Sequence, residues 1–366
     1  MMWRSASLVV GVTLVLSALG VVMLASTSSV QALQLHGQPH YFVVRQAVFL
    51  AVAMCAGFVC TRIDYRWWQT FAIPLAAVSL VLLALALVPG IGIRAGGSYR
   101  WIGLGPVNFQ PSELAKLSSV TLMAWYMARS QRQAHELWSG LLLPLLLLGS
   151  IVGLIFAAPD FGTTLLVALV GLLILFAGGS RIGHLTIAGF IGGVAFLLAV
   201  MHSPLRMRRV FAFLDPHEYA QDEAFQLLSA MYAFVIGGAG GVGLGQSIQK
   251  RFYLPEAHTD FIFAIVGEEL GLAASLFVVA CFAALFVAGM RIAQHAPDLF
   301  GKLLALGITL MVTLQAALNM AVVTGLVPTK GLPLPLISYG GSSLVMTMVM
   351  VGILVSIGLN AGTEEA

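Results

Sequence analysis

Apolar stretches long enough to cross a bilayer recur along almost the whole of this 366-residue chain. A helix that spans the hydrocarbon core needs about 20 predominantly apolar residues. Hydrophobic residues make up 59% of the sequence and charged residues only 9%, which is too little charge to cover the surface of a soluble globule. We therefore predict an all-α, polytopic integral membrane protein that forms a single transmembrane domain over residues 1–366. About ten transmembrane helices are expected, near residues 7–28, 41–60, 68–89, 112–128, 139–158, 161–178, 182–201, 261–290, 299–327 and 335–360.

Three connections between these helices carry most of the polar chemistry and are expected to be non-helical. They cover about residues 90–112, 202–259 and 327–336, and the second is a large extracytoplasmic loop between the seventh and eighth helices. Lys and Arg residues of the short loops are more numerous on the side of the N-terminus, which favours both termini in the cytoplasm. The three elaborate loops then lie on the outer face, where ATP is absent. A reaction there must draw its driving force from a bond already in the substrate.

Several common site types find no support in the sequence. Residues 238–243 read GAGGVG and match a phosphate-binding pattern, but no strand precedes them, which favours a flexible turn or close packing. Gly189, Gly192 and Gly193 are expected to let neighbouring helices approach closely. The net charge of +3 and the lack of a basic stripe interleaved with aromatic residues speak against nucleic acid as a partner. The three cysteines fall within apolar helices and indicate buried thiols rather than a disulfide or metal cluster: Cys55, Cys60 and Cys281.

Three acidic residues lie in or beside one apolar run, where an unpaired carboxylate is costly. Asp260 is expected at the start of a helix that runs inward from the outer interface. The positive end of the helix would keep this carboxylate ionised, so it is either a helix-terminal charge or a general base. Glu268 and Glu269 lie about 12–13 Å deeper at 1.5 Å per residue, which is farther than the spacing of paired glycosidase carboxylates. We expect a structural role for these two, paired inside the bundle.

The remaining charges near the outer loops offer an ion pair and a set of cations. Glu113 and Lys116 are three residues apart at the start of the fourth helix, where an ion pair that fixes a cavity wall is favoured over direct chemistry. Lys330 lies in a tight loop of Pro and Gly, an unusual place for a solvated charge. The large loop holds further cations that are suited either to anionic headgroups or to a pyrophosphate clamp: Arg206, Arg208, Arg209, Lys250 and Arg251.

Six blocks along the chain resemble the SEDS family of polytopic cell-wall polymerases, which is named for shape, elongation, division and sporulation. The blocks cover Gly96–Ser119, Ala158–Thr163, Arg206–Pro216, Phe225–Phe234, Gly241–Gly271 and Val323–Ser343. YLPEAHTDFIFAIVGEELG and PTKGLPLPLISYGGSS are more similar to the division branch than to the elongation branch, which usually lacks a lysine at the position of Lys330. Ala158 and Phe161 depart from the commoner glutamine and leucine.

The resemblance implies a peptidoglycan glycosyltransferase that polymerises lipid II on the outer face of the bacterial cytoplasmic (inner) membrane during cell division, at the septum. Undecaprenyl diphosphate would be the leaving group, and the configuration at the anomeric carbon would be inverted. The family's essential acid falls on Asp260, and its ion pair on Glu113 and Lys116. Candidates for holding the diphosphate are Arg100, Arg209, Lys330 and Arg206. No cofactor is certain, and a divalent cation such as Mg²⁺ is a further source of positive charge, although the sequence shows no all-protein metal cage.

The resemblance also implies partners, because the chain has no transpeptidase motif set of its own. A class B penicillin-binding protein would supply crosslinking, and other divisome proteins would surround the pair. Two alternatives from other classes are a lipid II flippase or other transporter and a structural scaffold of the divisome. A third alternative is the elongation-type polymerase of the same family. The sequence leaves the partner's identity, the metal requirement and the donor and acceptor subsites open.

Overall fold

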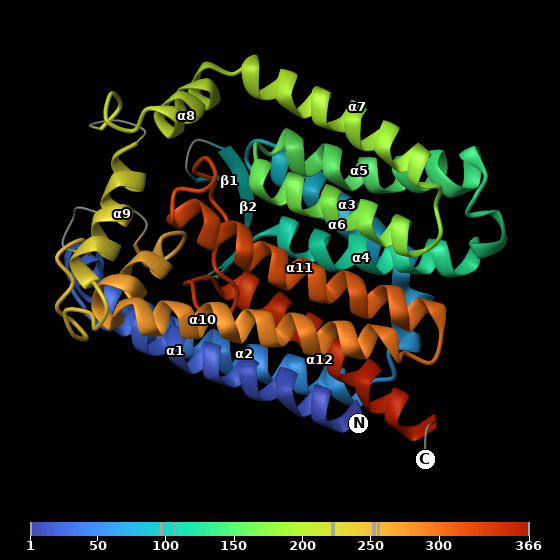
Figure 1. Ribbon diagram of the computed structural model, residues 1–366, viewed down its shortest axis with the longest axis horizontal. Helices are drawn as coiled ribbons and strands as arrows, with labels where there is room; N and C mark the ends of the chain where they lie inside the picture. The colour runs from blue at the N-terminus through green and yellow to red at the C-terminus, as the bar shows by residue number, and fades with distance from the viewer. Residues whose placement is uncertain are drawn as a thin grey trace.

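Long apolar helices make up most of the computed structural model, which describes residues 2–95, 98–105, 107–220, 224–250, 254 and 257–364 (Figure 1). A helix lies within each of the predicted segments, so the helical membrane fold is confirmed. These helices are α1 (Met2–His36), α2 (Tyr41–Arg62), α3 (Arg66–Leu87), α4 (Pro111–Arg129), α5 (Leu143–Ala157, preceded by a π-helical turn over Trp138–Leu142), α6 (Phe161–Ala177), α7 (Ile182–Met201), α10 (Ile262–Gln294), α11 (Leu299–Val323) and α12 (Gly341–Glu364).

Eight helices of the described part are long and apolar enough to cross a membrane by length and composition. Of the ten predicted spans, α4 and α6 fall outside this set. α6 is apolar but short, and α4 is buried on nearly all sides by the bundle while carrying Glu113, Lys116 and several hydroxyl residues. A helix enclosed by protein does not need an apolar surface, which is why hydropathy describes α4 poorly. The number of ten spans stays a prediction.

α10 lies in the middle of the packing, against α1, α9 and α11, while α12 packs most extensively against α2. Gly57 and Gly352 face each other across the α2–α12 contact, where a Cβ atom at Gly352 would overlap the Gly57 backbone. Close backbone approach of this kind is how membrane helices associate where lipid gives no hydrophobic drive. The first turns of α6 and α11 are capped by Asp160 and Asp298, whose side chains accept hydrogen bonds from backbone N–H groups.

A break in α10 receives the glycine-rich loop that precedes it. Gly271 has φ +78°, so the helical hydrogen bonds are interrupted there. Val242 and Gly243 donate their backbone N–H groups to the carbonyl oxygens of Glu268 and Glu269, at 2.9 and 3.0 Å. A Cβ atom on Gly241 would overlap the same backbone. The GAGGVG segment is therefore a site of close packing.

The first predicted loop folds into a small antiparallel sheet of β1 (Gly92–Ala95), β2 (Ser98–Leu104) and β3 (Val107–Phe109), in the order β1-β2-β3. The register pairs Gly92 with Ile102 and Leu104 with Val107. Gly105, at φ +68°, turns the chain between β2 and β3. The segment is non-helical as predicted, and the sheet fixes where Arg100 lies.

The large loop at residues 202–259 is not wholly non-helical, and that prediction is wrong. It contains α8 (Pro204–Leu214) and α9 (Phe225–Gly237). α8 starts with Pro204 at its first turn, a favoured position for proline, and α9 is a short apolar helix. Both are shorter than a membrane span, so a search for spanning lengths passes over them.

α7 runs along one edge of the bundle, and none of its residues is buried (Figure 1). Gly189, Gly192 and Gly193 have no neighbouring atom within 4 Å of an added Cβ, so the expectation that they serve close packing is wrong. The sheet, α8 and α9 lie at one end of the bundle, and both termini lie at the other (Figure 1). The termini thus share one side, and which side that is stays a prediction.

Candidate functional site

Asp260 lies in a turn directly before α10, whose first helical residue is Ile262. The expectation that it begins the helix is therefore off by two residues. The Asp260 carbonyl accepts a hydrogen bond from Asn319 Nδ2 at 2.7 Å, and the same amide group donates to Leu332 O at 2.6 Å. A Cβ atom on Gly331 would lie 3.0 Å from Asp260 Oδ2, so glycine leaves room for the carboxylate. Asn319 of α11 thus holds both the backbone of Asp260 and the loop at Leu332.

The loop between α11 and α12 is pinned to the segment that carries Asp260. Ser338 Oγ donates to Thr259 O at 2.6 Å and accepts from Leu334 N at 2.8 Å. Tyr339 N donates to His258 O at 3.0 Å. α12 accordingly starts at Gly341 rather than near residue 335, since this prolyl loop makes turns instead of a helix. These hydrogen bonds hold the loop before α12 against the segment before α10, although the two are far apart in the sequence.

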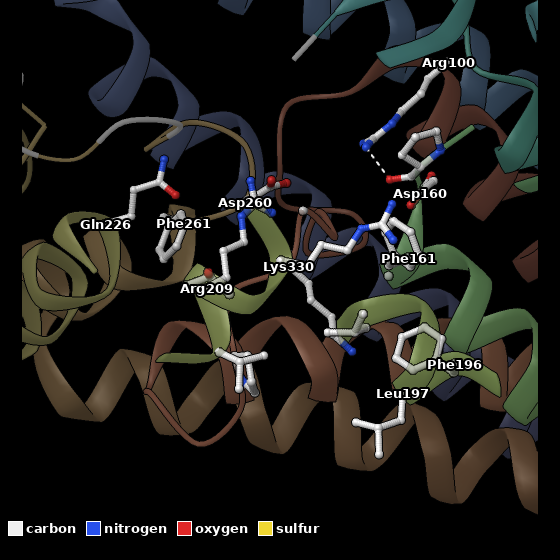
Figure 2. A pocket seen from close by; sticks show the side chains of 18 residues that line it. Arg100, Asp160, Phe161, Phe196, Leu197, Arg209, Gln226, Asp260, Phe261 and Lys330 are labelled. Atoms are coloured by element: carbon white, nitrogen blue, oxygen red, sulfur yellow. Dashed lines mark hydrogen bonds between the residues drawn. The ribbon is translucent and has the colours of Figure 1, made fainter. Parts of the chain in front are cut away.

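A cavity of about 580 Å³ opens beside Asp260 (Figure 2). It gathers the predicted site residues of three outer segments: Arg100 from β2, Arg206 and Arg209 from α8, and Lys330 from the loop before α12. Its remaining lining mixes apolar and polar side chains: Pro159, Asp160, Phe161, Gly162, Phe196, Leu197, Val200, Val210, Gln226, Phe261, Pro328, Thr329 and Gly331. Two carboxylates, four cations and an apolar wall therefore share a single space.

Arg100 is fixed by the turn between α5 and α6. Its guanidinium donates to Ala158 O at 3.0 Å and to Pro159 O at 2.6 Å. The neighbouring Asp160 is buried, caps α6 through Thr163 N at 3.2 Å and accepts from Ser112 Oγ at 3.4 Å. Arg100 thus reaches the cavity already oriented by carbonyl groups, with part of its hydrogen-bonding capacity used.

Arg206 and Lys330 both lie over aromatic rings. The Arg206 guanidinium is 3.6 Å from the centroid of Phe161 and donates to Ala199 O at 3.0 Å. Lys330 Nζ is 5.6 Å from the centroid of Phe196. Such contacts hold a cation at modest cost in hydration. Phe161, which stands where leucine is commoner in the family that the sequence resembles, therefore supplies the ring beneath Arg206.

Burial weakens the proton affinity of these two cations. It lowers the pKa of the Lys330 ammonium below its ordinary value. Burial, followed by repulsion from the nearby Arg209, lowers the pKa of Arg206. An anion that entered the cavity would reverse both effects, because it favours the charged forms. The arrangement is consequently suited to a ligand with concentrated negative charge.

Glu113 and Lys116 form a buried ion pair at 2.7 Å outside the cavity lining. Lys116 Nζ also donates to Gln315 Oε1 at 2.8 Å, and Gln315 Nε2 donates to Pro333 O at 2.8 Å. The pair on α4 is thus connected through α11 to the loop that holds Lys330. This geometry fits support of the cavity wall and gives the pair no contact with the cavity itself.

Glu268 and Glu269 hold the loop that fits into the break in α10. Glu268 accepts from Ser247 Oγ and from Ile248 N, the latter at 2.8 Å. Glu269 pairs with Lys250 Nζ at 2.7 Å, with both side chains buried. Glu269 is thus ion-paired and Glu268 is held by neutral hydrogen-bond donors, and neither carboxylate lines the cavity.

The cations of the large loop separate into different environments. Arg206 and Arg209 line the cavity, Arg208 is exposed, and Lys250 is taken up by Glu269. Arg251 lies outside the described residues. A single clamp built from all five is therefore not what the structure shows.

Three residues of the site escaped sequence reasoning: Gln226, Phe196 and Asn319. Each lies within an apolar helix, on α9, α7 and α11. A polar residue inside an apolar run is a usable signal, since it needs a partner there. It could have selected Gln226 and Asn319, whereas nothing distinguishes Phe196 from its apolar neighbours.

The described residues contain no group of three or more His, Cys, Asp and Glu side chains arranged for a metal ion. The carboxylates of the cavity lining are Asp160 and Asp260. Magnesium commonly binds through one or two carboxylates together with substrate phosphates. The residues present therefore fit a magnesium ion that arrives with a phosphorylated substrate.

The chain is similar to known proteins along almost its whole length. The family model described as "Cell cycle protein", for FtsW, RodA and SpoVE, matches residues 6–362. A relative from Trichlorobacter lovleyi named "Probable peptidoglycan glycosyltransferase FtsW" is 43% identical over 351 residues, which are 96% of this chain and 92% of the relative. Stage V sporulation protein E of Bacillus subtilis is 38% identical over 350 residues, 96% of each chain.

Two solved structures share the whole fold. A chain from the structure titled "Structural coordination of polymerization and crosslinking by a peptidoglycan synthase complex" superposes with a TM-score of 0.80 at 29% identity, over 96% of this chain and 97% of that one. The rod shape determining protein RodA of Thermus thermophilus superposes with a TM-score of 0.73 at 28% identity, over 96% of both chains.

Proposed function

This chain belongs to the family of cell cycle proteins FtsW, RodA and SpoVE, and from that membership we propose that it is a peptidoglycan glycosyltransferase that polymerises lipid II into glycan strands. The observation that carries the proposal is the single cavity in which Asp260 lies among Arg100, Arg206, Arg209 and Lys330. A base beside a cluster of cations is what a sugar transfer from a lipid diphosphate requires.

In the proposed reaction, Asp260 is the general base. Its carboxylate takes the proton from the 4-hydroxyl group of the acceptor N-acetylglucosamine as that oxygen attacks the anomeric carbon of the donor. The new carbon–oxygen bond forms while the bond to the diphosphate breaks, and undecaprenyl diphosphate leaves with the bonding electrons. One displacement inverts the configuration, and the energy comes from the diphosphate bond of the substrate itself.

The four cations stabilise the negative charge that grows on the departing diphosphate. Arg100 and Arg206 are pre-oriented by carbonyl groups, and arginine can form paired hydrogen bonds to phosphate oxygens. Lys330 adds a point charge that becomes more basic when the anion is bound. A magnesium ion held by Asp160 and the diphosphate would supply further charge neutralisation when bound.

The proposal extends to partners and place. A solved relative takes part in a peptidoglycan synthase complex that coordinates polymerization and crosslinking. We infer that this chain likewise works with a class B penicillin-binding protein that crosslinks the strands, together with other divisome proteins. The FtsW relatives favour cell division at the septum over elongation. The cavity would open to the outer face of the inner membrane, with both termini in the cytoplasm.

Reconstitution with purified lipid II tests the proposal. The protein is incorporated into vesicles with lipid II and Mg²⁺, with and without the penicillin-binding partner, and glycan strands are separated by length. The wild type is expected to form strands, and Asp260→Asn, which keeps the shape but removes the base, is expected to lose at least about a hundredfold in rate. Transbilayer movement of lipid II without any glycan would establish the flippase alternative instead, and normal polymerisation by Asp260→Asn would refute the mechanism.

A further inference from the structure

The cavity is chemically different on the two sides of Asp260 (Figure 2). One side presents Arg100 together with apolar side chains of α6 and α7: Phe161, Phe196 and Leu197. The opposite side presents Gln226 of α9 and the ring of Phe261. Arg209 projects from α8 toward the carboxylate between these two sides. The space is thus polarised, with positive charge and an apolar path on one side and a neutral polar group on the other.

Gln226 is the neutral polar group of that second side. Gln226 is the second residue of α9, and its side chain is half-buried. No hydrogen bond to its side chain occurs within the described part of the chain, and the residues before and after it in sequence, Phe225 and Leu227, are apolar. A carboxamide can donate two hydrogen bonds and accept two. The amide lines the cavity, so a ligand there can form hydrogen bonds to it in place of water.

The two substrates of the proposed reaction differ in the same way as the two sides. The donor brings a diphosphate that must leave and a polyprenyl chain that must lie along an apolar surface. The reacting end of the acceptor is an uncharged N-acetylated sugar, which offers hydroxyl and amide groups for hydrogen bonding. A carboxamide recognises such groups without adding charge beside the base.

We propose that Gln226 binds the acceptor sugar, so that the α9 side of the cavity is the acceptor subsite and the side of Arg100, Lys330 and Phe196 is the donor subsite. This assignment rests on the proposed function. Asp260 lies between the subsites, where it can take the proton of the acceptor hydroxyl as the diphosphate departs on the far side. In-line displacement requires this opposition of the attacking oxygen and the leaving group.

The test separates the two substrates chemically. A lipid II analogue whose terminal sugar has the galacto configuration at carbon 4 can act as a donor but lacks the equatorial hydroxyl group of an acceptor. Every galactose-capped product therefore begins with one transfer from the analogue to lipid II, and the initial rate of all capped products, whatever their length, reports that transfer. Lipid II is varied at fixed analogue to give the acceptor KM, and the analogue is varied at fixed lipid II to give the donor KM. Gln226→Met keeps the volume and removes the amide. It is expected to raise the acceptor KM about tenfold and to leave the donor KM unchanged, whereas Lys330→Met is expected to do the reverse.

Control variants make each outcome decisive. Gln69→Met makes the same substitution at an exposed position of α3, outside the cavity, and is expected to change neither constant. If Gln226→Met does not fold, Gln226→Asn withdraws the amide by one methylene and should also raise only the acceptor KM. An unchanged acceptor KM, or a raised donor KM, overturns the subsite assignment while wild-type polymerisation upholds the proposed function. No glycan from the wild type overturns the proposed function itself.

Discussion

At the scale of single residues, Asn319 decides where the proposed base lies. Its amide donates to Asp260 O at 2.7 Å and Leu332 O at 2.6 Å, which ties the two loops of the site together. Asn319→Ala removes both hydrogen bonds, at a cost of about 1–3 kcal/mol for a buried group. We expect kcat to fall about tenfold or more, with little change in KM, because Asp260 is displaced while the subsites remain. Steady-state polymerisation and thermal unfolding in detergent measure the two effects.

The matched control for this prediction is Asn360→Ala on α12, where the amide bonds a carbonyl of its own helix at 2.9 Å. This variant is expected to polymerise at the wild-type rate. Asn319→Asp gives a second check, since an ionised carboxylate cannot donate either hydrogen bond. Wild-type kcat in both Asn319 variants would show that the amide does not position Asp260.

Lys330 gives the site a pH dependence of known sign. Burial lowers the pKa of this ammonium, so it loses its proton at a lower pH than an exposed lysine does. Below that lowered pKa the side chain is charged and can bind diphosphate, and above it binding weakens by up to about tenfold per pH unit. Lys330→Arg stays charged across the range, because the guanidinium keeps its proton. Inhibition by undecaprenyl diphosphate should therefore weaken at alkaline pH in the wild type only. The same pH profile in both proteins would exclude Lys330 as its source.

Sequence reasoning reached some of these residues and not others, for physical reasons. Asp260 was visible because a carboxylate beside a long apolar run is costly, and because its motif resembles a known family. Asn319 was not visible in the sequence, since its partner Asp260 is 59 positions away along the chain and only the folded loops bring the two together. Gln226 was hidden by the assumption that its segment is non-helical.

At the scale of elements, the length of the apolar stretches predicted the spanning helices well and the short elements that shape the cavity poorly. α2 and α7 match their predicted ranges within two residues, because a bilayer imposes a minimum length. α8, α9 and the three-stranded sheet obey no such constraint. They are short, and their stability comes from contacts with the bundle rather than from their own sequence.

A buried ion pair is one of the contacts that hold the loop in the break of α10. Lys250 Nζ lies 2.7 Å from Glu269 Oε1, and Ser26 of α1 bonds both groups. Lys250→Met leaves Glu269 buried without its counter-charge and should destabilise the protein by about 3–5 kcal/mol. The double variant Lys250→Met with Glu269→Gln removes both charges and should recover much of that loss. Thermal unfolding of the two variants measures this difference. Equal losses of stability in the single and the double variant would show that the pair does not hold the loop.

At the scale of the whole molecule, chemistry and termini occupy opposite ends of the bundle (Figure 1). The sheet, α8, α9 and the loop before α12 converge on one end, and each contributes to the cavity or to its support. Membrane insertion fixes such an arrangement permanently, because neither end can cross the bilayer afterwards. Which compartment the cavity faces therefore determines which substrates it can meet.

The orientation can be tested with two engineered cysteines in a chain whose three native cysteines are replaced by serine. His217→Cys lies on the exposed connection between α8 and α9, and Gln131→Cys lies on the exposed turn after α4, at the end where the termini lie. A membrane-impermeant maleimide is expected to label His217→Cys in intact spheroplasts, and Gln131→Cys only after permeabilisation. The reverse pattern would place the cavity in the cytoplasm, where ATP is available and where glycan strands made by the cavity would not reach the outer face of the membrane. The argument that the substrate must carry its own activated leaving group, because ATP is absent, holds only if His217→Cys is labelled in intact spheroplasts and Gln131→Cys is not.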